Sequence, residues 1–182
     1  MKRISTSLFV FNLIIWMVFS PLPILPQEKT NTWEVFFSPN GGCTKAIVRE
    51  LNKGKSTILV QAYSFTSAPI AKALLNAHYR RVKVEVILDK SQRTQKYSSA
   101  TFLFNAGIPT KIDGAHTIAH NKVMIIDEEI VITGSFNFTK AAEGNNAENL
   151  LIIHDKKLAS LYTKEWQDHA QHSEIYFVKT GR

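Results

Sequence analysis

The stretch that decides the fold runs from His120 to Asn137 and reads HNKVMIIDEEIVITGSFN. Two apolar runs, 123–126 and 130–133, have the size of short buried strands, and the acidic residues between them favour a turn. The stretch therefore predicts an antiparallel hairpin that brings the chain back to the level at which it started.

Polar side chains gather at the open end of this predicted hairpin. His120 and Lys122 lie two residues apart and so point to the same face of a strand, and the returning strand brings Ser135 and Asn137 beside them. The ammonium, hydroxyl and carboxamide suit the oxygens of a phosphoryl group, and an imidazole can attack phosphorus or donate a proton. Gly134 would let the backbone approach the phosphate closely. A His-x-Lys pair alone is usually a solvated face, but the whole set at fixed spacing indicates a catalytic site.

Strands and helices alternate on both sides of the hairpin. Apolar runs predict further strands at 33–37, 57–63, 82–88 and 150–153. Helical periodicity predicts helices at 43–52, 67–80, 100–106 and 156–172. The fold class is therefore α/β, with a mixed sheet sandwiched by helices, and a chain of 182 residues suits a single such domain, here 30–176.

The first 26 residues are expected to precede that domain. Lys2 and Arg3 come before an apolar run from Leu8 to Phe19, a pattern typical of a secretory signal peptide. A proline soon after the run fits cleavage poorly, which leaves open a retained membrane anchor from Leu8 to Leu25. Both alternatives export the domain, so we expect a periplasmic or secreted protein, free or held to the membrane by this segment.

Composition limits the partners and the kinds of site. The 22 Lys and Arg against 15 Asp and Glu give a net charge of +7, which favours polyanions such as nucleic acid or anionic lipid. One cysteine, Cys43, excludes an intramolecular disulfide and a multi-cysteine metal site, and we expect it to be a small buried residue. His154, His169 and His172 are expected at the surface, because no metal-ligand spacing is visible among them.

The decisive stretch also matches a known motif. Its spacing is that of the HKD signature, here His120-x-Lys122-x4-Asp127-x6-Gly134-Ser135-x-Asn137. The chain resembles the phospholipase D superfamily, and within it the small bacterial Nuc-type endonucleases that carry a single such motif. The resemblance runs from about Trp33 to Trp166 and includes AYSFT at 62–66 and NAEN at 146–149.

The resemblance implies a role for each matching residue. His120 would be the nucleophile that forms a covalent phosphohistidine, and Glu148 would hydrogen-bond its imidazole. The phosphate would be held by Lys122, Ser135 and Asn137. Asp127 would be structural, which agrees with its position at the end of the hairpin away from His120. The family requires neither a divalent metal nor a cofactor.

A single motif in the chain predicts a homodimer. In-line displacement at phosphorus needs a nucleophile on one side and an acid for the leaving oxygen on the other. One His120 cannot occupy both positions. Two chains related by a twofold axis would supply both groups, with the active site at their interface.

Other candidate residues carry weaker signals. Lys90, Arg93 and Lys96 form a basic loop after a predicted strand, which is either a site for the phosphate backbone or simply solvated. His116 is either a residue that lines the cleft or an ordinary loop histidine. Phe136 and Phe138 flank the site residues, and we expect them in the core.

Three functions stay open at this point. The first is a non-specific endonuclease acting on DNA or RNA, which the positive charge and the Nuc-type resemblance favour. The second is a phospholipase D acting on phosphatidyl headgroups, which the apolar N-terminal segment favours. The third is a non-catalytic nucleic-acid-binding module, against which the intact set of polar residues argues.

Overall fold

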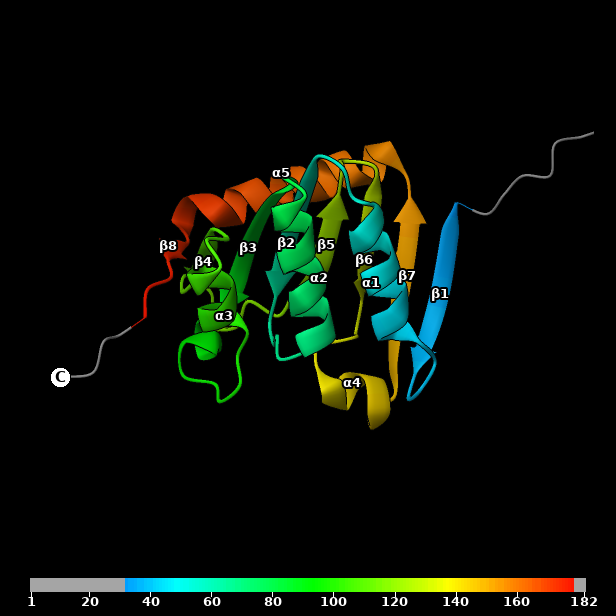
Figure 1. Cartoon of the computed structure of the whole chain (residues 1–182), viewed down its shortest axis with the longest axis horizontal. Helices are drawn as coiled ribbons and strands as arrows, with labels where there is room; N and C mark the ends of the chain where they lie inside the picture. The colour runs from blue at the N-terminus through cyan, green and yellow to red at the C-terminus, as the bar shows by residue number, and fades with distance from the viewer. Residues whose placement is uncertain (1–31, 179–182) are drawn as a thin grey trace, which may run out of the picture. The chain divides into compact units, whose positions relative to one another are not determined.

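The computed structural model describes residues 32–178, in which strands and helices alternate (Figure 1). The strands are β1 (Trp33–Ser38), β2 (Thr57–Ala62), β3 (Lys83–Asp89), β4 (Thr110–Asp113), β5 (Lys122–Ile126), β6 (Ile130–Gly134), β7 (Glu148–His154) and β8 (Glu174–Ile175). The helices are α1 (Cys43–Lys53), α2 (Ala68–Tyr79), α3 (Ala100–Asn105), α4 (Lys140–Gly144) and α5 (Lys156–His172), with a 3₁₀ turn η1 (Lys90–Arg93).

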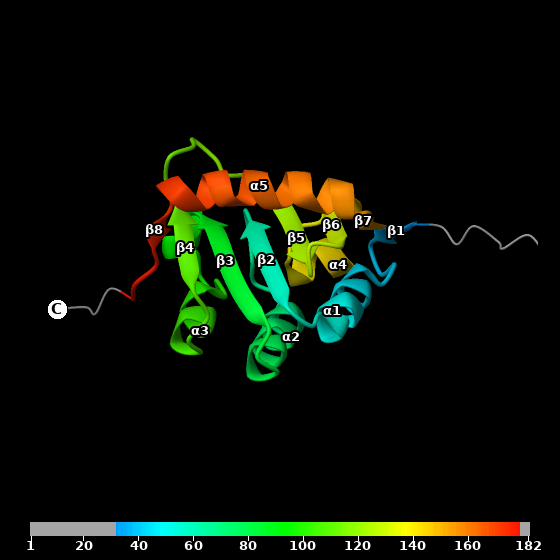
Figure 2. The same ribbon diagram turned by 90° about the horizontal axis from the view of Figure 1, so that it is seen from above.

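All of these strands form one sheet in the order β1-β7-β6-β5-β2-β3-β4-β8. β2, β3 and β4 run parallel to one another, and every other neighbouring pair is antiparallel. Helix α5 covers one face of the sheet, while α1, α2 and α3 cover the other (Figure 2). The predicted α/β class, a mixed sheet between helices, is confirmed.

The central strand β5 shows why these runs are apolar throughout. Val123 and Ile125 pack toward Trp166 of α5, in the smaller of two cores. Met124 and Ile126 point the other way, into the larger core against α1 and α2. Because helices bury both faces of the sheet, its inner strands lose the alternation of a half-exposed strand.

The strand ends fix where the polar motif residues lie. β5 and β6 form the predicted antiparallel hairpin, with Met124 opposite Ile132. Ala62, the last residue of β2, is paired with Lys122, the first of β5, and Gly134 at the end of β6 is paired with Leu150 of β7. The ends of β2 and β6 and the starts of β5 and β7 therefore meet at one edge of the sheet.

Three short elements are not anticipated by the sequence patterns. β4 has a single large apolar residue, Ile112, and exists because its backbone pairs with β3. α4 is five residues long, and the Thr139 hydroxyl caps it by accepting from the Ala142 N–H. β8 has two residues. Elements this short depend on tertiary contacts, which the local periodicity of a sequence does not reveal.

The predicted signal or anchor segment, 1–26, lies outside the described residues. Within residues 32–178, no helix has both the length and the apolar character needed to cross a membrane.

Candidate active site

The motif residues gather at the sheet edge where β2 and β6 end and β5 and β7 begin. His120 is exposed and lies two residues before β5, and Lys122 is the first residue of that strand. Ser135 directly follows β6, and Glu148 is the first residue of β7. The hairpin thus brings the two halves of the motif to the same edge, as the sequence predicts.

Tyr63 links the histidine and the lysine. Its ring centroid lies 4.5 Å from that of His120, and the Lys122 Nζ lies 5.0 Å from the same ring. The backbone N–H of Tyr63 also donates to the carbonyl of Asn121, at 2.8 Å. Tyr63 was not predicted as a site residue, because only the pairing of β2 with β5 places it there.

The Lys122 side chain is buried and its amine lies close to the backbone of His120. The residue is only 6% exposed, and burial lowers its pKa, while the nearby negative charge of Glu148 opposes that shift. Its Nζ donates to the carbonyl of His120, at 2.7 Å. No carboxylate among residues 32–178 forms an ion pair with it, so its charge stays available to an incoming anion.

Ser135 is oriented by the start of strand β7. Its Oγ accepts a hydrogen bond from the Asn149 N–H at 3.1 Å, so the hydroxyl hydrogen remains free to donate to a phosphate oxygen. Position 134 requires glycine because of the same neighbour, Asn149. Its φ is +148°, and a Cβ there would lie 2.3 Å from the carbonyl oxygen of Asn149. The close approach that requires glycine is therefore to β7.

Asn137 borders a polar hollow. Its side-chain oxygen Oδ1 is buried and has no hydrogen-bond partner within the described part of the chain. A hollow of about 340 Å³ opens beside it. The polar side chains that line it belong to Tyr63, Ser64, Thr66, Gln95, Asn137, Thr139 and Lys140. A buried acceptor without a donor beside an open hollow indicates that a donor group of a ligand, such as a sugar hydroxyl, completes the site.

Glu148 is near the site, but its carboxylate faces another residue. Its Oε1 accepts from the Asn146 Nδ2 at 3.2 Å, and within residues 32–178 no hydrogen bond joins it to His120. Its charge still reaches Lys122. The predicted bond from Glu148 to the imidazole therefore stays a prediction.

Asp127 lies at the opposite end of the hairpin, as predicted. Its carboxylate accepts hydrogen bonds from the backbone N–H groups of Lys55, Ser56 and Thr57 and from the Ser56 hydroxyl. Burial raises the pKa of Asp127, but these donors outweigh it and hold the pKa below its ordinary value. The contacts tie the hairpin turn to the loop that leads into β2.

The weaker candidates mostly bind protein groups. Lys90 Nζ donates to the His116 carbonyl at 2.9 Å, Arg93 pairs with a carboxylate of β8 at 2.7 Å, and Lys96 lies over an aromatic ring of its own loop. It is Gln95, from the same loop, that reaches the hollow.

The residues assigned to the core are found there. Phe136 and Phe138 are fully buried, as predicted. Cys43 is buried at the start of α1, and burial first, then the charge of Glu143, raises the pKa of its thiol to about 11. A thiol with so high a pKa is a poor nucleophile.

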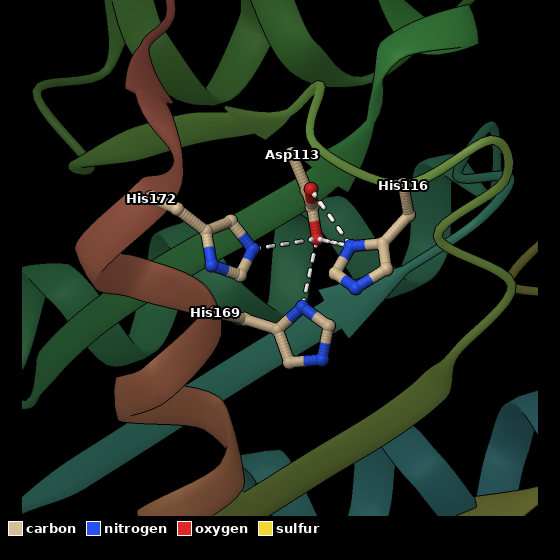
Figure 3. Close-up of side chains that lie close together, drawn as sticks. All are labelled: Asp113, His116, His169 and His172. Carbon is tan, nitrogen blue, oxygen red and sulfur yellow. Dashed lines mark hydrogen bonds and ion pairs between the residues drawn. The ribbon is translucent and has the colours of Figure 1, made fainter.

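A second polar cluster lies beneath the end of α5. Asp113, the last residue of β4, is fully buried, and His116, His169 and His172 turn ring nitrogens toward it (Figure 3). Burial raises the pKa of Asp113, but these imidazoles lower it to about 2. The expectation of a surface position is wrong for His169, which is 8% exposed. It could not be placed from the sequence because β4, which carries its partner, was not anticipated.

Comparisons with known proteins identify the family of the chain. Residues 47–170 match the family described as "Cardiolipin synthase, PLD-like domain". The chain is 43% identical over 153 residues to a phospholipase D of Rickettsia typhi, covering 84% of this chain and 75% of the relative. It is 49% identical over 142 residues to that of Rickettsia conorii, covering 78% and 70%.

The solved structure of Nuc from Salmonella typhimurium, a phospholipase D family member, has the same fold. It superposes with a TM-score of 0.76 at 39% identity, covering 79% of this chain and 97% of Nuc.

Proposed function

The chain belongs to the phospholipase D superfamily of phosphodiesterases, and we propose that it hydrolyses the phosphodiester backbone of DNA or RNA with little sequence preference. The polar hollow beside Asn137 is the observation that favours nucleic acid as the substrate. Hydroxyl groups, amide groups and the Lys140 side chain line it, and such groups suit a sugar–phosphate chain. The net charge of +7 also favours a polyanion.

The first half of the reaction uses His120 as the nucleophile. A ring nitrogen attacks phosphorus, the bond from phosphorus to the leaving oxygen breaks, and a phosphohistidine forms. Its exposed imidazole lies beside the Tyr63 ring and is open to substrate. Lys122, Ser135 and Asn137 hold the non-bridging oxygens, and the buried ammonium stabilises the charge that develops on them.

The first half also needs an acid on the far side of phosphorus, and the second half needs a base there. We propose that His120 of the partner subunit protonates the leaving oxygen. It then takes a proton from the water that attacks the phosphohistidine, and the phosphorus–nitrogen bond breaks. A homodimer with the site at its twofold interface is therefore part of the proposal.

One observation favours a second candidate substrate. Ile118 is 55% exposed and lies two residues before His120, where it could enter a lipid surface. The Rickettsia relatives are named phospholipase D. Hydrolysis of a phosphatidyl headgroup would use the same chemistry, so the site residues do not separate the two substrates.

A paired assay separates them. The purified protein is incubated with plasmid DNA and, in parallel, with phosphatidylcholine vesicles, both in EDTA. We expect nicked and linear DNA and intact lipid. Release of choline with intact DNA would instead establish the lipid activity, and tight DNA binding without cleavage of either substrate would point to a binding module.

The dimer and the export of the protein are tested separately. We expect sedimentation to give a mass of twice the chain, and a monomer that retained full activity would contradict the shared site. We also propose that the N-terminal segment exports the domain. Mass spectrometry of the exported protein would show whether that segment is removed or kept as an anchor.

A further inference from the structure

The cluster beneath the end of α5 has the composition of a metal site. Asp113 and His116 flank the end of β4, while His169 and His172 lie in the last turn of α5 (Figure 3). One ligand atom from each residue lies within 4.8 Å of the others. We propose that these four residues form a structural site for a divalent transition metal ion, with Zn²⁺ as the preferred ion.

The spacing of the rings fits tetrahedral coordination. With bonds from zinc to nitrogen of about 2.1 Å, the centroids of three bound imidazoles lie roughly 5 Å apart. The ring centroids of His116, His169 and His172 are separated by 4.9, 5.3 and 5.3 Å. The three rings thus already have the mutual spacing that the ion requires.

The three imidazole nitrogens converge on the Asp113 carboxylate. Nitrogens of His169, His116 and His172 lie 2.7, 3.0 and 3.4 Å from the same oxygen, Oδ2 of Asp113. The His116 nitrogen also lies 3.2 Å from Oδ1, so three imidazoles and the Ala115 N–H together surround one carboxylate. An ion between the four groups would instead take one lone pair from each. Ligands around zinc lie about 3.4 Å apart. The closest nitrogens would therefore move slightly away from Oδ2, and the ligand atoms that are up to 4.8 Å apart would move closer together.

The surroundings orient the ligands as they do in metal sites. The other carboxylate oxygen of Asp113 accepts from the Ala115 N–H at 3.1 Å, which leaves Oδ2 for the ion. The second ring nitrogen of His169 lies 3.4 Å from a carboxylate oxygen of Glu165. A bound imidazole commonly gives its other N–H to such a group. His116 and His172 are exposed, so an ion can enter from solvent.

The site would connect two parts of the chain distant in sequence. Four protein ligands indicate a structural rather than a catalytic ion. It would fasten the loop after β4, which leads to His120, to the end of α5. The site lies apart from the phosphate ligands, so its test is independent of the proposed hydrolysis.

Zinc binding can be measured directly on the full chain without a polyhistidine tag. The protein is stripped with a chelator, dialysed and titrated with ZnCl₂ by calorimetry. We expect one Zn²⁺ per chain with a Kd below about 1 μM. Saturating zinc should raise the unfolding temperature by roughly 5 °C or more, and Co²⁺ in its place should give the visible absorption bands of a tetrahedral site.

Variants at the exposed ligands identify the site. His116→Gln and His172→Gln should each weaken zinc binding at least about 100-fold and leave the unfolding temperature of the zinc-free protein close to that of the wild type. His154→Gln, at an exposed histidine outside the cluster, is the matched control and should bind zinc normally. Wild-type binding weaker than about 10 μM, or undiminished binding in either cluster variant, would overturn the proposal.

Discussion

The two ends of the β5–β6 hairpin carry residues of one motif but differ in how their polar groups are satisfied. At the turn, the Asp127 carboxylate accepts four hydrogen bonds from residues 55–57, where the chain enters β2. At the open end, Lys122 is buried without an ion-pair partner among residues 32–178, and Asn137 keeps an unpaired oxygen. The turn end is complete without a ligand, whereas the open end is not.

This difference separates residues that stabilise the fold from residues that react. A satisfied charge contributes to folding, and its loss is felt as instability. An unsatisfied buried group lowers stability and is retained for binding or catalysis. Substitutions at the open end should therefore reduce activity at little cost in stability, and substitutions at the turn should do the reverse.

The largest expected effect is at His120. Because its ring is the nucleophile in the proposed reaction, His120→Ala should reduce phosphodiester hydrolysis at least about 1,000-fold. The side chain is exposed and only its ring contacts Tyr63, so the free energy of unfolding should change by less than about 0.5 kcal/mol. Initial rates and urea unfolding measure the two quantities. His154→Ala is the control, and residual activity above a few per cent would contradict the assignment.

Lys122 should give the next largest loss. Lys122→Met keeps the length of the side chain and removes the charge, so activity should fall about 100-fold or more. Burial disfavours the ammonium in the folded protein, so stability should stay the same or rise by up to about 1 kcal/mol. Lys72→Met, at an exposed position of α2, is the control. A strongly destabilised Lys122→Met protein would contradict the proposal that residues at the open end contribute to activity rather than to stability.

Asp127 tests the turn end. Its φ is +54°, which asparagine tolerates, so Asp127→Asn keeps the backbone but replaces an acceptor by donors. We expect a loss of about 2–3 kcal/mol in the free energy of unfolding at pH 7, with activity per folded molecule unchanged. Urea unfolding measures the loss, and Glu128→Gln, at the exposed neighbour, should be neutral.

The same pair of proteins predicts a pH dependence. The pKa of Asp127 is lowered in the folded state, so its contribution to stability is complete above the pKa of about 3.9 in the unfolded chain. The contribution is lost as the pH falls through the lower folded pKa. The stability difference between wild type and Asp127→Asn should therefore be constant above about pH 5 and shrink below about pH 4. A difference that grew in acid would contradict this.

The hairpin was predictable because its information is local. The apolar runs fix two strands, their separation fixes the turn, and together they place Ser135 beside His120. Tyr63 and Asn149 were not predicted as site residues, because they reach the open end only through the pairing of β2 with β5 and of β6 with β7. Which strands become neighbours depends on packing of the whole sheet, to which local periodicity is insensitive.

The second cluster was missed for a related reason. Helical periodicity places α5 correctly, and Tyr162 and Trp166 pack against the sheet, but Leu161 is 61% exposed and His169 is buried. His169 is inside because Asp113 lies beneath it. Asp113 is placed by β4, a strand with one large apolar residue. The signal that could have found the site is the pair of short spacings, Asp113-x2-His116 and His169-x2-His172.

The smallest expected effect is that of a substitution at Gly134. This substitution tests the comparison of the two hairpin ends, because Gly134 lies at the open end but stabilises the fold. A Cβ there would meet the Asn149 carbonyl oxygen at 2.3 Å on a backbone with φ of +148°. Gly134→Ala should therefore reduce the free energy of unfolding by about 1–2 kcal/mol and shift activity only as far as Ser135 moves. Thermal unfolding checks this against Gly144→Ala, where nothing lies within 4 Å of the new Cβ. If Gly134→Ala instead abolished activity while keeping full stability, the glycine would belong with the residues that take part in the reaction. The result would contradict its assignment as a residue that serves the fold.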